Sequence, residues 1–149
     1  MKKFIILFVT ILLPLLFNVG CSKLSSRSAN TFAKLEETAV KDYRTAATPD
    51  QAISILNKHR DTILEYQKAA VAGLNFDYSL SVTDVRLYYL YKIKGDAAKA
   101  EAALTEALPG IHYVDLRLPQ NAAVTIDQAR QSAETYVTNT DKGAAWFPK

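Results

Sequence analysis

The sequence predicts an all-α fold, a small antiparallel bundle of about five helices with one helical hairpin. Three observations indicate this class. Apolar residues recur three or four positions apart in several segments, which places them on one face of a helix. Thr48–Gln51 and Thr125–Gln128 have the spacing of a capping box, which marks a helix start. Gly73, Gly95 and the Pro109-Gly110 pair stand where successive helices should end.

The first two predicted helices lie on either side of Thr48. The first spans about 31–46, with Asn30 as its cap. The second begins at Pro49, because proline suits the first helical position, and ends near Gly73. One face of the first helix carries Phe32, Leu35, Ala39 and Tyr43. The broad stripe of the second contains Ile53, Leu56, Arg60, Ile63, Leu64, Gln67 and Val71.

Three further helices are predicted in the second half of the chain. They run from Ser81 or Thr83 to about Lys94, from the cap Asp96 through Leu108, and from the cap Thr125 to about Asn139. An alternative exists for the segments before and between them. Residues 75–82 alternate polar and apolar side chains, which taken alone indicates a strand. The alternative fold is therefore α+β, with a two-stranded ribbon of residues 76–82 and 111–118, although an isolated ribbon is only marginally stable.

The N-terminal segment has the composition of an export signal. Lys2 and Lys3 precede an apolar run of 14 residues, Phe4 to Phe17, which is short for a membrane-spanning helix of about 20 residues. Val19-Gly20-Cys21 follows and resembles the lipobox of bacterial lipoproteins, an aliphatic residue, a small residue, Gly or Ala, and then Cys. Asn18 departs from that pattern, which usually has Leu at this position.

The lipobox resemblance implies that Cys21 is a lipidation site. In that family the thiol receives a diacylglyceryl group, the signal is cut before the cysteine, and the new amine is acylated, for example with palmitate. Two other interpretations stay open, a plain secretory signal with an unrelated cysteine and an uncleaved N-terminal anchor. Since two or more acyl chains hold a protein firmly to a bilayer, the resemblance implies a membrane anchor and no other cofactor.

The chain is thus predicted to have four parts. Residues 1–20 are the cleaved signal peptide, residues 21–30 the lipidated N-terminus and a flexible Ser-rich tether, residues 31–140 the helical domain, and residues 141–149 a C-terminal tail. Ser22 stands where Asp would retain a lipoprotein in the inner membrane, so the resemblance implies the outer membrane, facing the periplasm, in a Gram-negative host. In another host it implies the outer face of the cytoplasmic membrane.

The segment from Leu87 to Pro109 resembles one tetratricopeptide repeat (TPR), a pair of antiparallel helices joined at Gly95. The small, large and small positions of the second helix of the repeat are occupied by Ala100, Leu104 and Ala107. Tyr88 and Asp84 depart from the family pattern, and no second copy follows at its period of about 34 residues. A degenerate peptide-binding repeat and a simple pair of packed helices with an Ala-rich seam both stay open.

Charge and cysteine content exclude some function classes. Removing Lys2 and Lys3 with the signal leaves 16 Lys and Arg against 15 Asp and Glu, so the formal net charge falls from +3 to +1. A nearly neutral chain gives no electrostatic reason to expect nucleic-acid binding. With Cys21 as its only cysteine, the exported chain has neither an intramolecular disulfide nor a second reactive thiol.

The sequence predicts no metal site and no catalytic residues. His59 and His112 have no neighbours spaced as helical metal ligands. Asp61 and Glu65 are carboxylates one helical turn apart, but acid–base catalysis requires one of them to be buried with a raised pKa. Lysines flank the pair, which favours a solvated surface.

Two groups of aromatic residues are candidates for a partner-binding surface. Consecutive tyrosines on one helix cannot all face one core, and tyrosine and arginine are enriched in binding hot spots. The Trp-Phe pair in the tail either docks on the bundle or forms a short linear motif. The candidate residues are Arg86, Tyr88, Tyr89, Tyr91, Trp146 and Phe147.

Together these features predict an envelope lipoprotein whose helical domain binds another protein without catalysing a reaction. The expected partners are the membrane, through the lipid anchor, and an envelope protein. One alternative is an envelope hydrolase or peptidoglycan-acting enzyme, which a pocket around Asp61 or Glu65 would favour. The other is a surface-exclusion or inhibitor lipoprotein of a mobile genetic element, for which no single residue is diagnostic.

Overall fold

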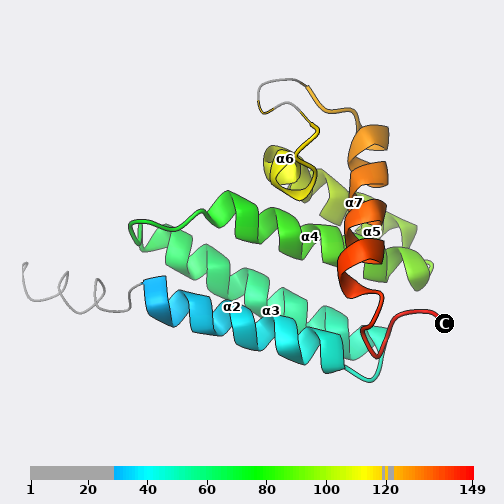
Figure 1. The fold of residues 1–149 in the computed structure, drawn as a ribbon, viewed down its shortest axis with the longest axis horizontal. Coiled ribbons are helices and arrows are strands. Elements are labelled where there is room, and N and C mark those ends of the chain that lie inside the picture. The colour runs from blue at the N-terminus through cyan, green and yellow to red at the C-terminus, as the bar shows by residue number, and fades with distance from the viewer. Residues whose placement is uncertain (1–28, 119, 121–122) are drawn as a thin grey trace, which may run out of the picture.

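The computed structural model describes residues 29–118, 120 and 123–149, and all the regular secondary structure in these ranges is helical (Figure 1). The predicted all-α class is therefore confirmed. Cys21 and the predicted signal peptide lie outside the described residues. The elements in chain order are α2 (Ala29–Thr45), α3 (Pro49–Lys68), α4 (Phe76–Ile93), α5 (Ala97–Ala107), the 3-10 turn η1 (Leu108–Gly110), α6 (Ile111–Val114) and α7 (Ile126–Asp141). No helix among the described residues is long and apolar enough to cross a membrane.

The predicted helix starts at Thr48, Asp96 and Thr125 are confirmed. Each side chain accepts a hydrogen bond from the backbone N–H three residues later. At Thr125 the capping box is complete, because the Gln128 side chain accepts in return from the Thr125 backbone N–H. These local bonds satisfy N–H groups that the helix itself leaves without acceptors, so the sequence places the helix starts.

The predicted strand ribbon is wrong, and the tyrosine-rich helix starts earlier than expected. Asn75 caps α4 by accepting from the Tyr78 N–H at 3.1 Å, so residues 76–82 are the first two turns of a helix. Residues 111–114 form the short helix α6. The alternation misled because two of its polar positions, Ser79 and Ser81, are buried. Ser81 Oγ donates to the Ala107 carbonyl at 3.0 Å, and Ser79 is 5% exposed.

The second helix also ends earlier than its glycine suggests. It was expected to end near Gly73, but its last residue is Lys68. Ala69 closes the helix with its N–H on the Glu65 carbonyl, and Ala70 then takes a φ of +49°. A left-handed residue cannot continue a right-handed helix, so the chain leaves the helix three residues before the glycine.

Helix α4 occupies the centre of the bundle, with the α2–α3 hairpin on one side and α5, α6 and α7 on the other (Figure 1). Ten of its residues are buried, including the charged Asp84 and Arg86. It has no single polar face because neighbours cover most of its circumference. The largest fully buried apolar side chains on α4 and around it are Tyr43, Leu56, Ile63, Tyr88, Leu90, Leu104 and Ile111.

The predicted hairpin at Gly95 is present as α4 and α5. Gly95 adopts a φ of +79°, the left-handed conformation that glycine takes without steric cost. Ala100 and Ala107 are buried and bring the helices close together, while Leu104 is fully buried between them. The antiparallel helix pair is thus confirmed. Its resemblance to a tetratricopeptide repeat rests on the sequence alone.

Candidate functional site

The candidate binding residues on α4 do not form one surface. Arg86 and Tyr88 are only 8% and 2% exposed. Tyr89 and Tyr91 are half-buried, and they point in different directions: Tyr89 stacks on Phe147, whereas Tyr91 accepts from Asn57 of α3. Since successive residues of a helix are rotated by about 100°, this dispersal follows directly from their spacing. Arg86 and Tyr88 therefore have hydrogen-bond partners within the bundle.

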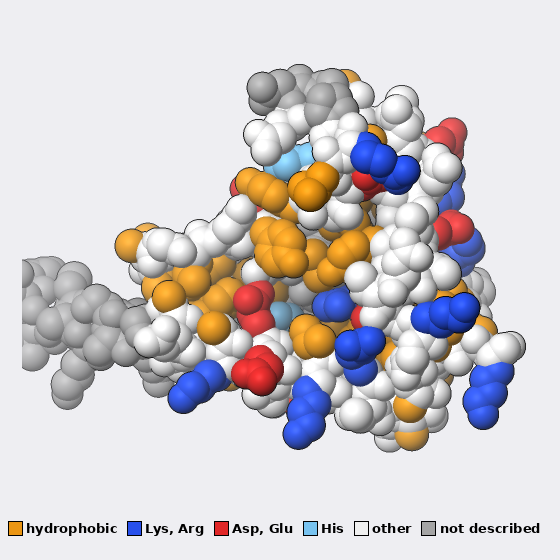
Figure 2. Space-filling model, in the orientation of Figure 1, with side chains coloured by type: hydrophobic (Ala, Val, Ile, Leu, Met, Phe, Trp, Pro, Cys, Tyr) orange, Lys and Arg blue, Asp and Glu red, His pale blue; other side chains and the backbone are white. Residues whose placement is uncertain are grey.

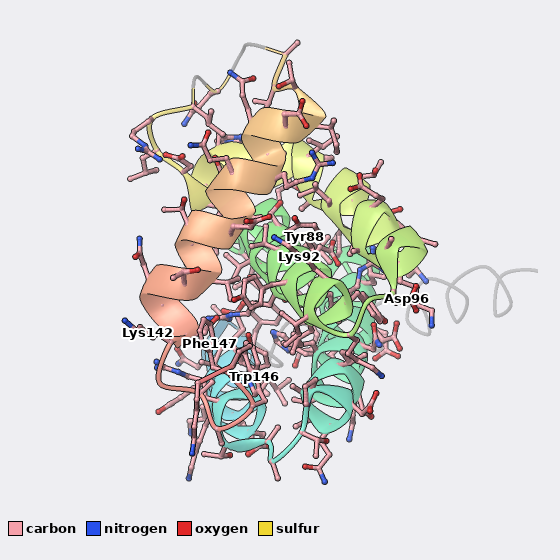
Figure 3. All side chains as sticks on the ribbon, turned by 90° about the vertical axis from the view of Figure 1, so that its right-hand side faces the viewer. Tyr88, Lys92, Asp96, Lys142, Trp146 and Phe147 are labelled. Carbon is pink, nitrogen blue, oxygen red and sulfur yellow. The ribbon has the colours of Figure 1, made fainter. Side chains whose placement is uncertain are left out.

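Tyr88 lies at the floor of a groove between α4, α5 and α7. Its hydroxyl donates to Glu134 Oε1 at 2.7 Å, and Lys92 Nζ contacts the same oxygen at 2.5 Å (Figure 3). Burial and the Glu134 carboxylate raise the pKa of Tyr88. The groove has a volume of about 220 Å³, and Glu101 and Arg130 on its walls are paired with each other. Its charged groups thus satisfy one another.

Arg86 is the centre of a buried polar cluster that joins α2, α4 and α7. Its Nε and Nη2 donate to the two oxygens of Asp141, at 2.9 and 3.3 Å. The guanidinium also lies over the ring of Tyr43 at 5.1 Å and over that of Tyr136 at 5.9 Å. Stacking of a guanidinium on aromatic rings stabilises a buried cation. We refer to Tyr43, Arg86, Tyr136 and Asp141 as the Arg86 cluster.

The electrostatics of the Arg86 cluster keep the Arg86 guanidinium and the Tyr43 hydroxyl protonated. Burial alone would lower the pKa of Arg86, but the charge of Asp141 and its hydrogen bonds raise it. Burial and the Asp141 carboxylate raise the pKa of Tyr43, so its hydroxyl stays protonated and donates to Asp141. His59, 8% exposed, has its pKa lowered by burial and by the Arg86 cation. A guanidinium and a hydroxyl that each stay protonated suit packing better than proton transfer.

Both tail aromatics dock on the bundle. Trp146 Nε1 donates to the Tyr43 carbonyl at 2.9 Å, and the Trp146 ring packs on the Tyr43 ring with centroids 5.1 Å apart. Phe147 stacks on Tyr89 at 5.6 Å (Figure 3). Of the two interpretations of this pair, the structure shows the docked one. The tail closes the end of the molecule where α2 ends.

Three tyrosines that the sequence did not single out lie together on another face. Tyr78 of α4 and Tyr113 of α6 meet edge to face with centroids 6.2 Å apart. Tyr78 is also close enough to Tyr136 of α7 to contribute to the raised pKa of that hydroxyl, after burial. Tyr78 is 43% exposed, and the other two are half-buried. We call Tyr78, Tyr113 and Tyr136 the tyrosine face.

The surface is hollowed where α4, α6 and α7 meet, and hydrophobic side chains gather there (Figure 2). Tyr136 connects this surface to the Arg86 cluster beneath it, because its ring also lies against the Arg86 guanidinium. Leu116, three residues after Tyr113, is 88% exposed. The only sequence signal for this face was the alternation around Tyr78, which suggested a strand, so the three tyrosines could be grouped only from the tertiary structure.

Groups suited to metal binding are not assembled in the part of the chain that the structure describes. No cluster of three or more His, Cys, Asp or Glu side chains that could hold a metal is found there. Asp61 and Glu65 are exposed on α3. A groove of about 240 Å³ between α2 and α3 includes neither carboxylate. Its lining residues are Leu35, Thr38, Ala39, Asp42, Ile55, Lys58, His59 and Thr62.

Comparison with known proteins adds no relative to this description. No protein-family model matches the chain, and no curated protein and no solved structure match it either.

Proposed function

We propose that this protein is a lipid-anchored envelope protein that binds another protein and catalyses no reaction. The sequence around Cys21 supports the anchor, and the tyrosine face supports the binding role. The observation that carries the binding role is the grouping of Tyr78, Tyr113 and Tyr136 over the Arg86 cluster.

Tyrosines suit a binding surface for a physical reason. Each presents a large, rigid apolar ring with a hydroxyl that can donate or accept a hydrogen bond, so it gains contact area at a small cost in side-chain entropy. The Arg86 cluster beneath fixes the backbones of α4 and α7, so the face is held in place before a partner arrives. A preorganised surface loses less entropy on binding.

The anchor is tested by lipid labelling in cells. Wild-type protein should incorporate labelled palmitate, and Cys21→Ala should abolish incorporation and release the domain from the membrane fraction. Ser22→Ala, which keeps the thiol, serves as the matched control and should still be labelled. Label on the Cys21→Ala protein would contradict the anchor.

The binding role is tested by site-specific photo-crosslinking in intact envelopes. A photoreactive phenylalanine analogue replaces Tyr78 or Tyr113 in one pair of variants and the exposed Ala102 of α5 in the control. We expect one discrete adduct with another protein from the two tyrosine positions and none from position 102. If all three positions give the same pattern, or none gives an adduct, the tyrosine face is not the binding surface.

The two alternative functions differ in the support that the described residues give them. The hydrolase hypothesis gains no support from Asp61 and Glu65, which line neither of the two grooves described above. An inhibitor or surface-exclusion lipoprotein of a mobile element would also act by binding, so the crosslinked partner would distinguish it from an assembly factor. The envelope location and the outer-membrane expectation from Ser22 stay predictions.

A further inference from the structure

We propose that the loop between α3 and α4, taken with the first residue of α4 as residues 69–76, lies against the phospholipid surface to which Cys21 is attached. The inference rests on the proposed lipid anchor. It adds an orientation, because the α3–α4 end of the bundle would face the bilayer and the tyrosine face would stay accessible from the aqueous side.

The composition of this loop is unusual for a surface turn. Eight consecutive residues, Ala-Ala-Val-Ala-Gly-Leu-Asn-Phe, carry no charge, and Lys68 and Asp77 bound them. Surface turns are normally built from Gly, Asn, Asp, Ser and Pro. Here Ala69, Ala70 and Ala72 are exposed, and Ala70 adopts a φ of +49°, which favours Gly or Asn over alanine. A loop in contact with water alone has no physical reason for this choice.

The loop lies at the same end of the molecule as the start of α2, from which the chain leads back to Cys21 (Figure 1). Phe32, in the first turn of α2, packs on Tyr66 with centroids 5.1 Å apart and on Phe76 at 5.7 Å. Hydrophobic side chains gather over this end of the surface as well (Figure 2). The start of α2 and the loop are thus joined by direct aromatic contacts.

The length of chain between anchor and domain limits how far this end can move from the bilayer. Residues 21–28 precede α2, and even a fully extended chain of that length spans at most about 28 Å. Helix α3 has 20 residues and is about 30 Å long. The opposite end of the bundle could therefore contact the bilayer in place of the loop only if the whole domain turned over. Tethering also raises the local lipid concentration, so a weak contact is sufficient.

The chemistry of the loop fits the interfacial region of phospholipids. Small apolar side chains and the half-buried Val71 and Leu74 can enter the boundary between headgroups and acyl chains without burying a charge. The charged residues Lys68 and Asp77 stand at its two edges, where the headgroups and water are. This arrangement gives shallow contact and excludes spanning.

A tryptophan introduced into the loop by Ala72→Trp tests the contact. Mature protein, residues 21–149, is prepared without lipid and coupled through the Cys21 thiol to maleimide phospholipid in vesicles of phosphatidylcholine and phosphatidylglycerol. Acyl chains brominated near the headgroup quench a nearby indole. We expect the introduced indole to lose at least about half of its emission in brominated vesicles, because shallow insertion brings it to the acyl boundary.

Two controls accompany this variant. The wild-type protein reports on Trp146, which is 5% exposed and packs on Tyr43 near the other end of α2, so its emission should not change. Ala102→Trp places an indole at an exposed alanine of α5 and should also be unaffected. Equal emission of the Ala72→Trp protein with and without bromine would overturn the proposal. A spectral change that depends on protein density but not on bromine would assign the loop to contact with a second copy, and would overturn it too.

Chemical coupling makes this test independent of natural lipidation. If Cys21 takes up no palmitate in cells but the coupled Ala72→Trp protein is quenched, the anchor fails and the lipid affinity of the loop stands. If palmitate is incorporated but quenching is absent, the anchor stands and the loop inference fails. Ala72→Asp combined with a reporter at the exposed Ala69→Trp, where φ is −75°, provides a second variant, in which the added charge should abolish quenching.

Discussion

Arg86 and Asp141 form a two-point ion pair between the middle of α4 and the last residue of α7, with side chains only 9% and 1% exposed. The Tyr43 hydroxyl donates to the same carboxylate at 3.3 Å, and Arg44 Nη2 donates to the Thr140 carbonyl at 2.7 Å. Three helices that are distant in the chain are therefore held at one point. The same pair fixes the helices that carry the tyrosine face.

Removing one partner of the buried pair should destabilise the fold strongly. Asp141→Ala leaves a buried guanidinium without its carboxylate, which typically costs about 3–5 kcal/mol of unfolding free energy. Urea unfolding followed by Trp146 fluorescence measures the loss, since Trp146 is the only tryptophan and contacts Tyr43.

The control for that experiment is an exposed ion pair on the same helix. Asp127 pairs with Arg130, but its side chain is 84% exposed. Asp127→Ala should therefore cost no more than about 1 kcal/mol. The double variant Arg86→Met/Asp141→Leu should be more stable than Asp141→Ala, because no unpaired charge remains. Equal losses for Asp141→Ala and Asp127→Ala would show that the buried pair is not the structural centre.

Gly110→Ala should destabilise the contact between η1 and α4. A Cβ at Gly110 would lie 2.6 Å from the Asp77 carbonyl oxygen and would also overlap the Ser81 side chain. A backbone oxygen cannot move aside as a flexible side chain can, so overpacking of about 1–3 kcal/mol is expected. Gly143→Ala, where nothing lies within 4 Å, is the matched control and should stay within about 0.5 kcal/mol of wild type.

The stability of the protein should depend on Asp84 between about pH 4 and 6. Burial raises the pKa of Asp84 to about 6, although Arg60 Nε at 2.7 Å lowers it. The folded state then binds the proton more tightly than the unfolded state. The contribution of Asp84 to stability is therefore fully present below its unfolded pKa and is lost as the pH rises through 6.

Comparison of wild type with Asp84→Asn isolates this effect. His59 acts in the opposite sense, because its lowered pKa makes the folded state weaker as the pH falls, so the slope of the wild type alone is ambiguous. Urea midpoints at several pH values should give a wild-type advantage over Asp84→Asn that shrinks as the pH rises from 4 to 7. Asp61→Asn, an exposed carboxylate of α3, should show no such trend, and a constant difference for Asp84→Asn would contradict the assignment.

The docked tail should contribute to stability through Trp146. Trp146→Ala removes a buried ring and should cost about 3–5 kcal/mol. Trp146→Phe keeps an apolar ring but loses the bond to the Tyr43 carbonyl, so about 1–2 kcal/mol is expected. Far-UV circular dichroism follows unfolding in these variants, and Pro148→Ala, at an exposed position, is the control. Wild-type stability in Trp146→Ala would mean that the tail does not hold the bundle.

The predicted elements differ from the observed ones where burial reversed a local pattern. The alternation at 75–82 suggested a strand facing water on one side, but Ser79 and Ser81 are buried and bonded to α2 and α5. The same reversal affected the candidate site, since Arg86 and Tyr88 were candidates for a binding surface and are buried. Their partners Asp141 and Glu134 lie 55 and 46 residues away, so no short-range pattern contains them.

The all-α class, the helix starts at Thr48, Asp96 and Thr125, and the turn at Gly95 follow from local sequence, because caps and glycine turns depend on contacts within three or four residues. The burial of Arg86 and the common face of Tyr78, Tyr113 and Tyr136 are seen only once the helices are packed together. Such groupings depend on contacts between helices that are distant in the chain, where packing decides which side of each helix meets water.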